Sequence, residues 1–223
     1  MKRELKMPRP HKRMNHTYTS ETFRSVPCII GIDQSYKRTG ISIAVNGKLK
    51  KITSVDFQKV KYKPEKRRLL REKLSKAIEV CMSHFSTDEI VVIYERIRTI
   101  TQTDLLNPTY IKATGALCAV ITDTAFDYGI ECWSVDTRAW KSGVLGTSKP
   151  CAIEYPGVTD PKKILDVKFI VDLGFGDDII RYKRIKKGSN RKSKDFSYDD
   201  DAADSACIAL YGFVKEPKLK KEM

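Results

Sequence analysis

Four acidic residues occupy positions from which separate stretches of the chain could bring their carboxylates together. Asp33 ends an apolar run that begins at Cys28, and Glu95 ends a second apolar run. Asp201 and Asp204 are three residues apart at the start of a helical pattern, so they share one helix face. Carboxylates crowded into one volume repel and raise one another's pKa unless cations neutralise them. Divalent cations with oxygen ligands, Mg²⁺ above all, are the expected partners.

Such a cluster is suited to hydrolysis of a phosphodiester bond. Two metal ions about 4 Å apart can activate a water molecule and stabilise the leaving oxygen. Each acid taken alone has a plainer explanation, because an Asp after a strand is usually a turn residue and acids at a helix start complement the helix dipole. We therefore expect Asp199 and Asp200 only to cap the last helix, while the other four acids bind metal.

The hydrophobic pattern predicts the elements that must position these acids. Strands are expected at 28–32, 41–45, 49–57, 89–94 and 130–135, and helices at 65–85, 107–129, 164–173 and 199–213. Asn46-Gly47 is typical of a hairpin turn between two of these strands. The order indicates an α/β, ribonuclease H-like fold, a mixed five-stranded sheet with helices on both faces. The strands that end at Asp33 and Glu95 should run parallel, which places both acids at one sheet edge.

The composition and charge of the chain limit the classes of protein to which it can belong. The 223 residues hold 42 Lys and Arg against 28 Asp and Glu, a net charge of +14 that implies a polyanionic partner. We expect a basic arm at 1–26, one domain at 27–214 and a basic tail at 215–223. The six scattered cysteines indicate reduced thiols, and no apolar stretch is long enough to span a membrane, so a cytoplasmic protein is expected.

Four motifs carry a family resemblance. In this order and spacing, GIDQSYKRTGISIAV, VVIYERI, VDTRAWKSGVLGTSK and DDAADSACIAL resemble the RuvC family of Holliday junction resolvases, in particular its phage-type members. The DAADSA helix is the most specific of the four, and the resemblance runs from about Pro27 to Val214. It implies an endonuclease that resolves four-way and other branched DNA junctions by paired symmetric nicks. It also implies a homodimer, since one site cannot reach two opposed strands at once.

The resemblance also implies roles for individual residues. Asp33, Glu95, Asp201 and Asp204 would be catalytic and would hold two Mg²⁺ ions, for which Mn²⁺ could substitute. Lys149, in the G-T-S-K segment, would be a catalytic lysine near the scissile phosphate. Lys141 is a second candidate for phosphate contact.

Basic residues outside the carboxylate motifs are candidates for DNA binding. Arg98 stands where bacterial family members carry an aromatic wedge, so the junction centre must be unstacked differently or by Ile97. The stretch 181–194 is basic without an acid, and it is either a DNA-binding segment or a solvated loop. Its candidate residues are Arg181, Lys183, Arg184, Lys186, Lys187, Arg191 and Lys192. The helix face of Lys66, Arg67, Arg71 and Lys73 is open to the same two interpretations.

Two other functions remain open at this point. The first is a different nuclease of the same fold, acting on RNA–DNA hybrids or belonging to the transposases or terminases. The second is a binder of branched DNA without catalysis. Intact carboxylates at all four positions favour an enzyme.

Overall fold

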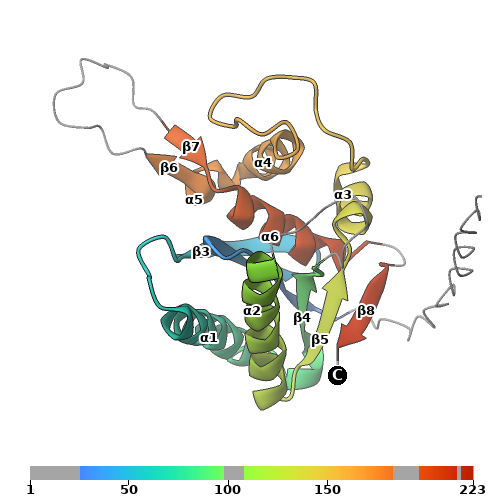
Figure 1. Cartoon of the computed structure of the whole chain (residues 1–223). Coiled ribbons are helices and arrows are strands. Elements are labelled where there is room, and N and C mark those ends of the chain that lie inside the picture. Colours follow the sequence, from blue (N-terminus) through green and yellow to red (C-terminus); the bar gives the residue numbers. More distant parts are fainter. Residues whose placement is uncertain (1–25, 98–107, 183–195, 215–216, 223) are drawn as a thin grey trace, which may run out of the picture.

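The computed structural model describes residues 26–97, 108–182, 196–214 and 217–222. A six-stranded mixed sheet in the order β3-β2-β1-β4-β5-β8 forms its centre (Figure 1). The strands are β1 (Cys28–Gln34), β2 (Arg38–Val45), β3 (Lys48–Asp56), β4 (Ile90–Glu95), β5 (Glu131–Val135) and β8 (Leu219–Glu222). β1, β2 and β3 form an antiparallel meander, and β1, β4 and β5 are parallel. The mixed α/β fold expected from the sequence is therefore confirmed.

The sheet has one strand more than the five that the sequence predicts. Leu219–Glu222, inside the segment expected to be a basic tail, pairs antiparallel with β5 and covers its outer edge. The LKKE segment has no apolar alternation, so it carries no strand signal of its own. Its pairing is stabilised by the neighbour, since Lys221 forms an ion pair with Glu131 and Ser134 donates a hydrogen bond to Glu222.

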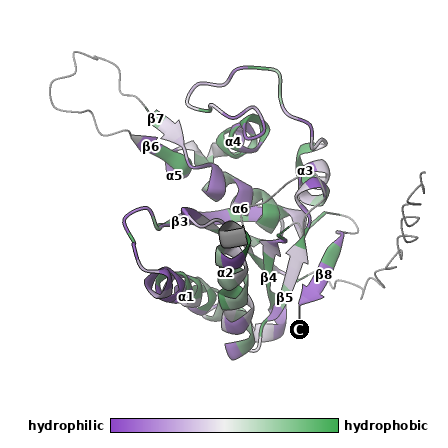
Figure 2. Ribbon diagram, in the orientation of Figure 1, coloured by the Kyte–Doolittle hydropathy of each residue, from purple (hydrophilic) through white to green (hydrophobic). Residues whose placement is uncertain are grey.

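Helices cover both faces of the sheet, as the alternation of elements predicts. On one face lie α1 (Lys63–Met82) and α2 (Pro108–Asp127), joined to the sheet by a cluster that includes Leu70, Ile78 and Ile121. On the other face lie α6 (Asp200–Tyr211), α3 (Thr137–Leu145) and α4 (Ile164–Ile170). In Figure 2 most of strand β4 is green, whereas α1 shows both purple and green residues, as expected of a helix with only one face on the core.

The chain between β5 and α6 departs most from expectation. The motif after β5 forms the helix α3, which the apolar pattern did not predict, and the helix expected at 164–173 ends earlier, at Ile170. A π-helical turn, Val171–Phe175, follows it, and Gly174 within this turn has a φ of 90° that interrupts the helix. A short helix α5 (Gly176–Ile179) then leads to the hairpin of β6 (Ile180–Tyr182) and β7 (Phe196–Tyr198).

Small residues allow α6 to lie directly on the sheet. A Cβ on Gly31 would stand 2.3 Å from the backbone of Ala209, and a Cβ on Gly40 would stand 2.0 Å from the carbonyl oxygen of Asp201. Ser42 and Ser205 share a buried hydrogen bond of 2.6 Å across the same contact. The first turn of α6 is therefore held against β2, beside the end of β1. No helix in the described part of the chain is long and apolar enough to cross a membrane.

Candidate active site

Strand geometry brings the first two acids to one edge of the sheet. β1 and β4 are parallel with Ile32 opposite Tyr94, so Asp33 and Glu95 both lie at the carboxyl ends of neighbouring strands. Asp33 is buried and Glu95 is partly buried. The carboxyl edge of an open α/β sheet is the usual place for a site, so the strand-end prediction is consistent with this geometry.

Glu95 is oriented by helix α3. Thr137 Oγ1 donates a hydrogen bond of 2.7 Å to Glu95 Oε1, and Trp140 Nε1 donates one of 2.9 Å to Glu95 Oε2. Asp136 caps this helix by accepting a hydrogen bond from the backbone N–H of Arg138, which fixes the helix directly after β5. The sequence reasoning missed Thr137 and Trp140 as site residues, although both lie in the VDTRAWK motif that supports the family resemblance.

The last helix adds the other two acids. Burial, and then the charges of Glu95, Asp204 and Asp201, raise the pKa of Asp33 well above its ordinary value, against the opposite effect of Lys163. Burial and Asp204 likewise raise the pKa of Glu95, partly offset by its hydrogen bonds. Burial, followed by Asp200, raises the pKa of Asp201 to about 7. The geometry agrees, because Asp201 lies against Gly40, the residue paired with Asp33 across β1 and β2.

The lysine that reaches this cluster is Lys163, which precedes α4. Its ammonium group forms an ion pair with Asp204. Burial alone would lower the pKa of Lys163, but the carboxylates of Asp204 and Asp33 raise it well above its ordinary value. Lys149, which the resemblance places near the scissile phosphate, lies exposed in the loop after α3, where its backbone N–H donates to Thr147 Oγ1 at 3.1 Å. The described contacts do not connect Lys149 with the carboxylates.

Lys141 does not have the exposed position that phosphate contact would need. Its side chain is buried, and its Nζ donates to the carbonyl oxygen of Lys162 at 3.0 Å and pairs with Asp166. This position disfavours the phosphate contact predicted for Lys141. The physical reason is that Asp166 on α4 holds the ammonium group inside the fold, where it joins α3 to α4.

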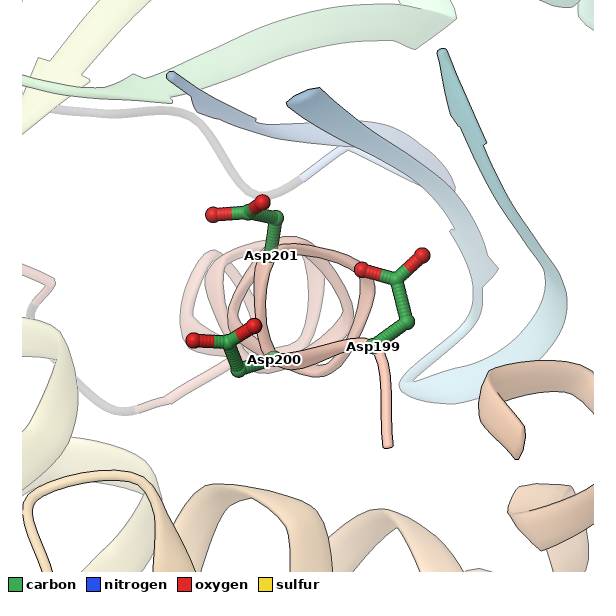
Figure 3. A group of neighbouring side chains, drawn as sticks. All are labelled: Asp199, Asp200 and Asp201. Carbon is green, nitrogen blue, oxygen red and sulfur yellow. The ribbon is translucent and has the colours of Figure 1, made fainter. Parts of the chain in front are cut away.

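The three consecutive acids at the start of α6 have different surroundings. Oxygen atoms of Asp199, Asp200 and Asp201 lie within 4.8 Å of one another, around the first turn shown in Figure 3. Asp199 is the N-cap: it accepts hydrogen bonds from the N–H of Ala202 and from Ser54 Oγ. It also forms an ion pair with Arg181. These donors occupy Asp199, so its expected role as a cap is confirmed, and Asp201 is the member of the trio that belongs to the carboxylate cluster.

Of the remaining DNA-binding candidates, one lies in the described part of the chain and the others lie outside it. Arg181 is directed to Asp199 at the base of the β6–β7 hairpin. Arg98, Lys183, Arg184, Lys186, Lys187, Arg191 and Lys192 lie outside the described residues.

The carboxylate oxygens of this cluster are suitable ligands for a divalent cation such as Mg²⁺. Asp204 Oδ1 and Asp166 Oδ1 are buried, and neither has a hydrogen-bond donor among the described residues. Burial, and then Asp204, raise the pKa of Asp166 to about 8. Either a proton on Asp166 or a cation at the cluster satisfies these oxygens. Several carboxylate oxygens gathered at one site are the ligands that Mg²⁺ and Mn²⁺ prefer.

Together, sheet order and helix placement define a ribonuclease H-like fold of the kind found in RuvC. RuvC from Thermus thermophilus is 16% identical, with a TM-score of 0.53 over 87% of this chain and 99% of that chain. The same RuvC in complex with a Holliday junction substrate is 11% identical, with a TM-score of 0.55 and the same coverage. The yeast mitochondrial Holliday junction resolvase Ydc2 is 15% identical, with a TM-score of 0.46 over 87% of this chain and 80% of that chain.

The two RuvC structures share the fold of this chain at low identity. No protein-family model matches the sequence, and a search of curated proteins finds no match.

Proposed function

We propose that this protein is a divalent-metal-dependent endonuclease that cuts four-way and other branched DNA junctions. The observation that carries the proposal is the placement of Asp33, Glu95, Asp201 and Asp204 at one sheet edge, where burial and neighbouring carboxylates raise the pKa of Asp33, Glu95 and Asp201. Structural carboxylates are usually paired one to one with cations, whereas the cations that lower the pKa values of Asp33, Glu95 and Asp201 are Lys163 and, for Asp201, Arg38. Crowded acids of this kind are a frequent mark of a functional site.

The four acids would hold two Mg²⁺ ions, with Mn²⁺ as a substitute. When bound, such ions activate a water molecule and stabilise the leaving oxygen of a phosphodiester. The residues of this chain prepare the site. Thr137 and Trp140 hold both oxygens of Glu95 in one orientation. Lys163 fixes Asp204 and lowers the net charge of the cluster, which reduces the repulsion an incoming phosphate meets.

Three observations support DNA as the substrate. The net charge of +14 favours a polyanion. The fold is shared with a RuvC that has been solved with a Holliday junction. The four sequence motifs resemble those of junction resolvases in order and spacing. Since a junction has near two-fold symmetry, we propose a homodimer with two identical sites, in which Lys149, Arg98 and the basic segment 181–194 contact phosphates.

Cleavage by amide variants tests the metal site. Asp33→Asn, Glu95→Gln, Asp201→Asn or Asp204→Asn should reduce Mg²⁺-dependent cleavage of a labelled four-way junction by at least about 1000-fold, because an amide keeps the shape but removes the charge. Junction binding should persist. Asp178→Asn, an exposed acid on α5, is the matched control and should leave cleavage unchanged. A carboxylate variant with near wild-type turnover at saturating Mg²⁺ would remove that residue from the site.

Cleavage of several nucleic-acid substrates tests the proposed preference for branched DNA. Purified protein with Mg²⁺ should cut the four-way junction faster than linear duplex or an RNA–DNA hybrid. Preferred cleavage of the hybrid would assign the protein to another nuclease class of this fold. Tight junction binding without cleavage in Mg²⁺ or Mn²⁺ would assign it to the non-catalytic binders.

A further inference from the structure

A cavity with a basic lining lies beside the site, on the face of the sheet opposite α6. It has a volume of about 170 Å³ and lies between α1, α2 and the turn that follows β1. Its charged residues are all cations, and no described acid lines it: Lys63, Lys66 and Arg67 come from α1, and Lys112 comes from α2. Tyr36 of the turn forms one wall. At about 30 Å³ per water molecule, the cavity has room for roughly five waters and so for one phosphate group.

Lys66 is built into this cavity rather than extended into solvent. The residue is only 6% exposed, its Nζ donates to the carbonyl oxygen of Tyr36 at 3.2 Å, and the same atom lies 3.7 Å from the centre of the Tyr36 ring. An ammonium group has three N–H donors. The carbonyl and the aromatic ring hold the ammonium group in place, while its other N–H donors are available to an anion.

The cations around Lys66 differ from their neighbours on the same helix. Arg68 pairs with Glu72, and Arg71 pairs with Asp127, so those charges are already compensated. Lys63, Arg67 and Lys112 form no ion pair with any acid of the described chain. Several like charges around one cavity repel each other, and an anion removes that cost. On the helix face that the sequence left open, Arg71 is paired, Lys66 and Arg67 line the cavity, and Lys73 lies outside it.

The cavity belongs to the same sheet edge as the carboxylates. Tyr36 follows Asp33 by three residues, and three residues span at most about 11 Å. α1 follows β3 and α2 follows β4, and both strands end at the edge where β1 ends, so both helices begin there. One DNA strand advances about 3.4 Å along its axis per nucleotide, so 11 Å corresponds to about three nucleotides.

We propose that this cavity binds a backbone phosphate of the DNA strand that enters the carboxylate site, within about three nucleotides of the bond to be cut. This inference rests on the proposed function and adds the residues that set the register of the strand. Lys66 and Tyr36 form the fixed base of the phosphate site. Arg67 and Lys112, from two different helices, close on the phosphate from either side.

The salt dependence of DNA binding tests this proposal. Arg67→Ala combined with Lys112→Ala removes two exposed charges of the cavity. Lys73→Ala combined with Lys76→Ala removes two exposed charges from α1 outside the cavity and is the matched control. Binding to a four-way junction is measured in EDTA, so that no cleavage occurs, and log affinity is plotted against log salt. The slope should fall by about 0.9 for the cavity variant, which loses one phosphate contact, and stay unchanged for the control.

Three outcomes would overturn the proposal. Equal slopes for both variants and the wild type would show that the cavity does not contact DNA. An equal decrease of the slope in both variants would show that the effect comes from the net charge of the protein and not from the cavity. Inorganic phosphate that binds the wild type but not the cavity variant, without any change in the DNA slope, would assign the cavity to a small free anion. The two proposals can fail separately. A protein that does not cut junctions would refute the proposed function, but the salt dependence of its DNA binding can still be measured. Melting temperatures of both variants confirm that they fold.

Discussion

The contact between α6 and β2 is the tightest structural requirement of the site, and Gly40→Ala tests it. The added Cβ would stand 2.0 Å from the carbonyl oxygen of Asp201 and 2.8 Å from Ser205 Oγ. Non-bonded heavy atoms are comfortable near 3.5 Å, so the first turn of α6 must withdraw from the sheet by about 1 Å or more. Backbone cannot rotate away as a side chain could. Overpacking of this kind costs about 1 to 3 kcal/mol, which lowers the melting temperature by about 2 to 12 °C in a protein of this size.

The same displacement carries Asp201 away from the other carboxylates. A misplacement of about 1 Å at a catalytic centre can cost about 100-fold in rate, so we expect a loss of that order in Mg²⁺-dependent junction cleavage. Gly176→Ala is the matched control, because Gly176 has helical backbone angles and its Cβ would meet Val171 at an ordinary 3.5 Å. The control should keep full cleavage and the same or a slightly higher melting temperature. A Gly40→Ala protein with unchanged melting temperature and rate would refute the close-packing argument.

Two further predictions concern the carboxylates. Because the pKa of Asp201 is raised to about 7, the folded protein binds more protons than the unfolded chain, and metal-free protein should lose stability as pH rises from about 4 to 7. Melting temperatures in EDTA should show this loss, and saturating Mg²⁺ should reduce it. Asp201→Asn should lower the pH slope, with the remainder due to Asp33, Glu95 and Asp166; an unchanged slope in that variant would contradict the assignment. Trp140→Phe removes a donor to Glu95 and should slow cleavage by about 10- to 100-fold with junction binding kept, since a hydrogen bond to a charged group contributes about 1.5 to 3 kcal/mol. Full activity of Trp140→Phe and of Thr137→Val would mean that α3 does not orient Glu95.

The local pattern of the sequence was enough to predict the core of the fold and the four carboxylates. Buried strands appear as continuous apolar runs, and the residue that ends such a run lies at the sheet edge whatever the rest of the chain does. A spacing of three residues at the start of a helix puts Asp201 and Asp204 on one face by geometry alone. These features depend on neighbours in the chain, so they can be predicted without tertiary contacts.

Tertiary structure alone decided which other side chains reach the carboxylates. The sequence motifs single out Lys141 and Lys149 but not Lys163. The path of the chain through α3 and α4 nevertheless buries Lys141 against Asp166, exposes Lys149 and brings Lys163 to Asp204. The same holds for β8, whose LKKE sequence becomes a strand only because β5 offers it an open edge. Charge and polarity do not specify a partner, and contacts between distant segments depend on how the whole chain packs.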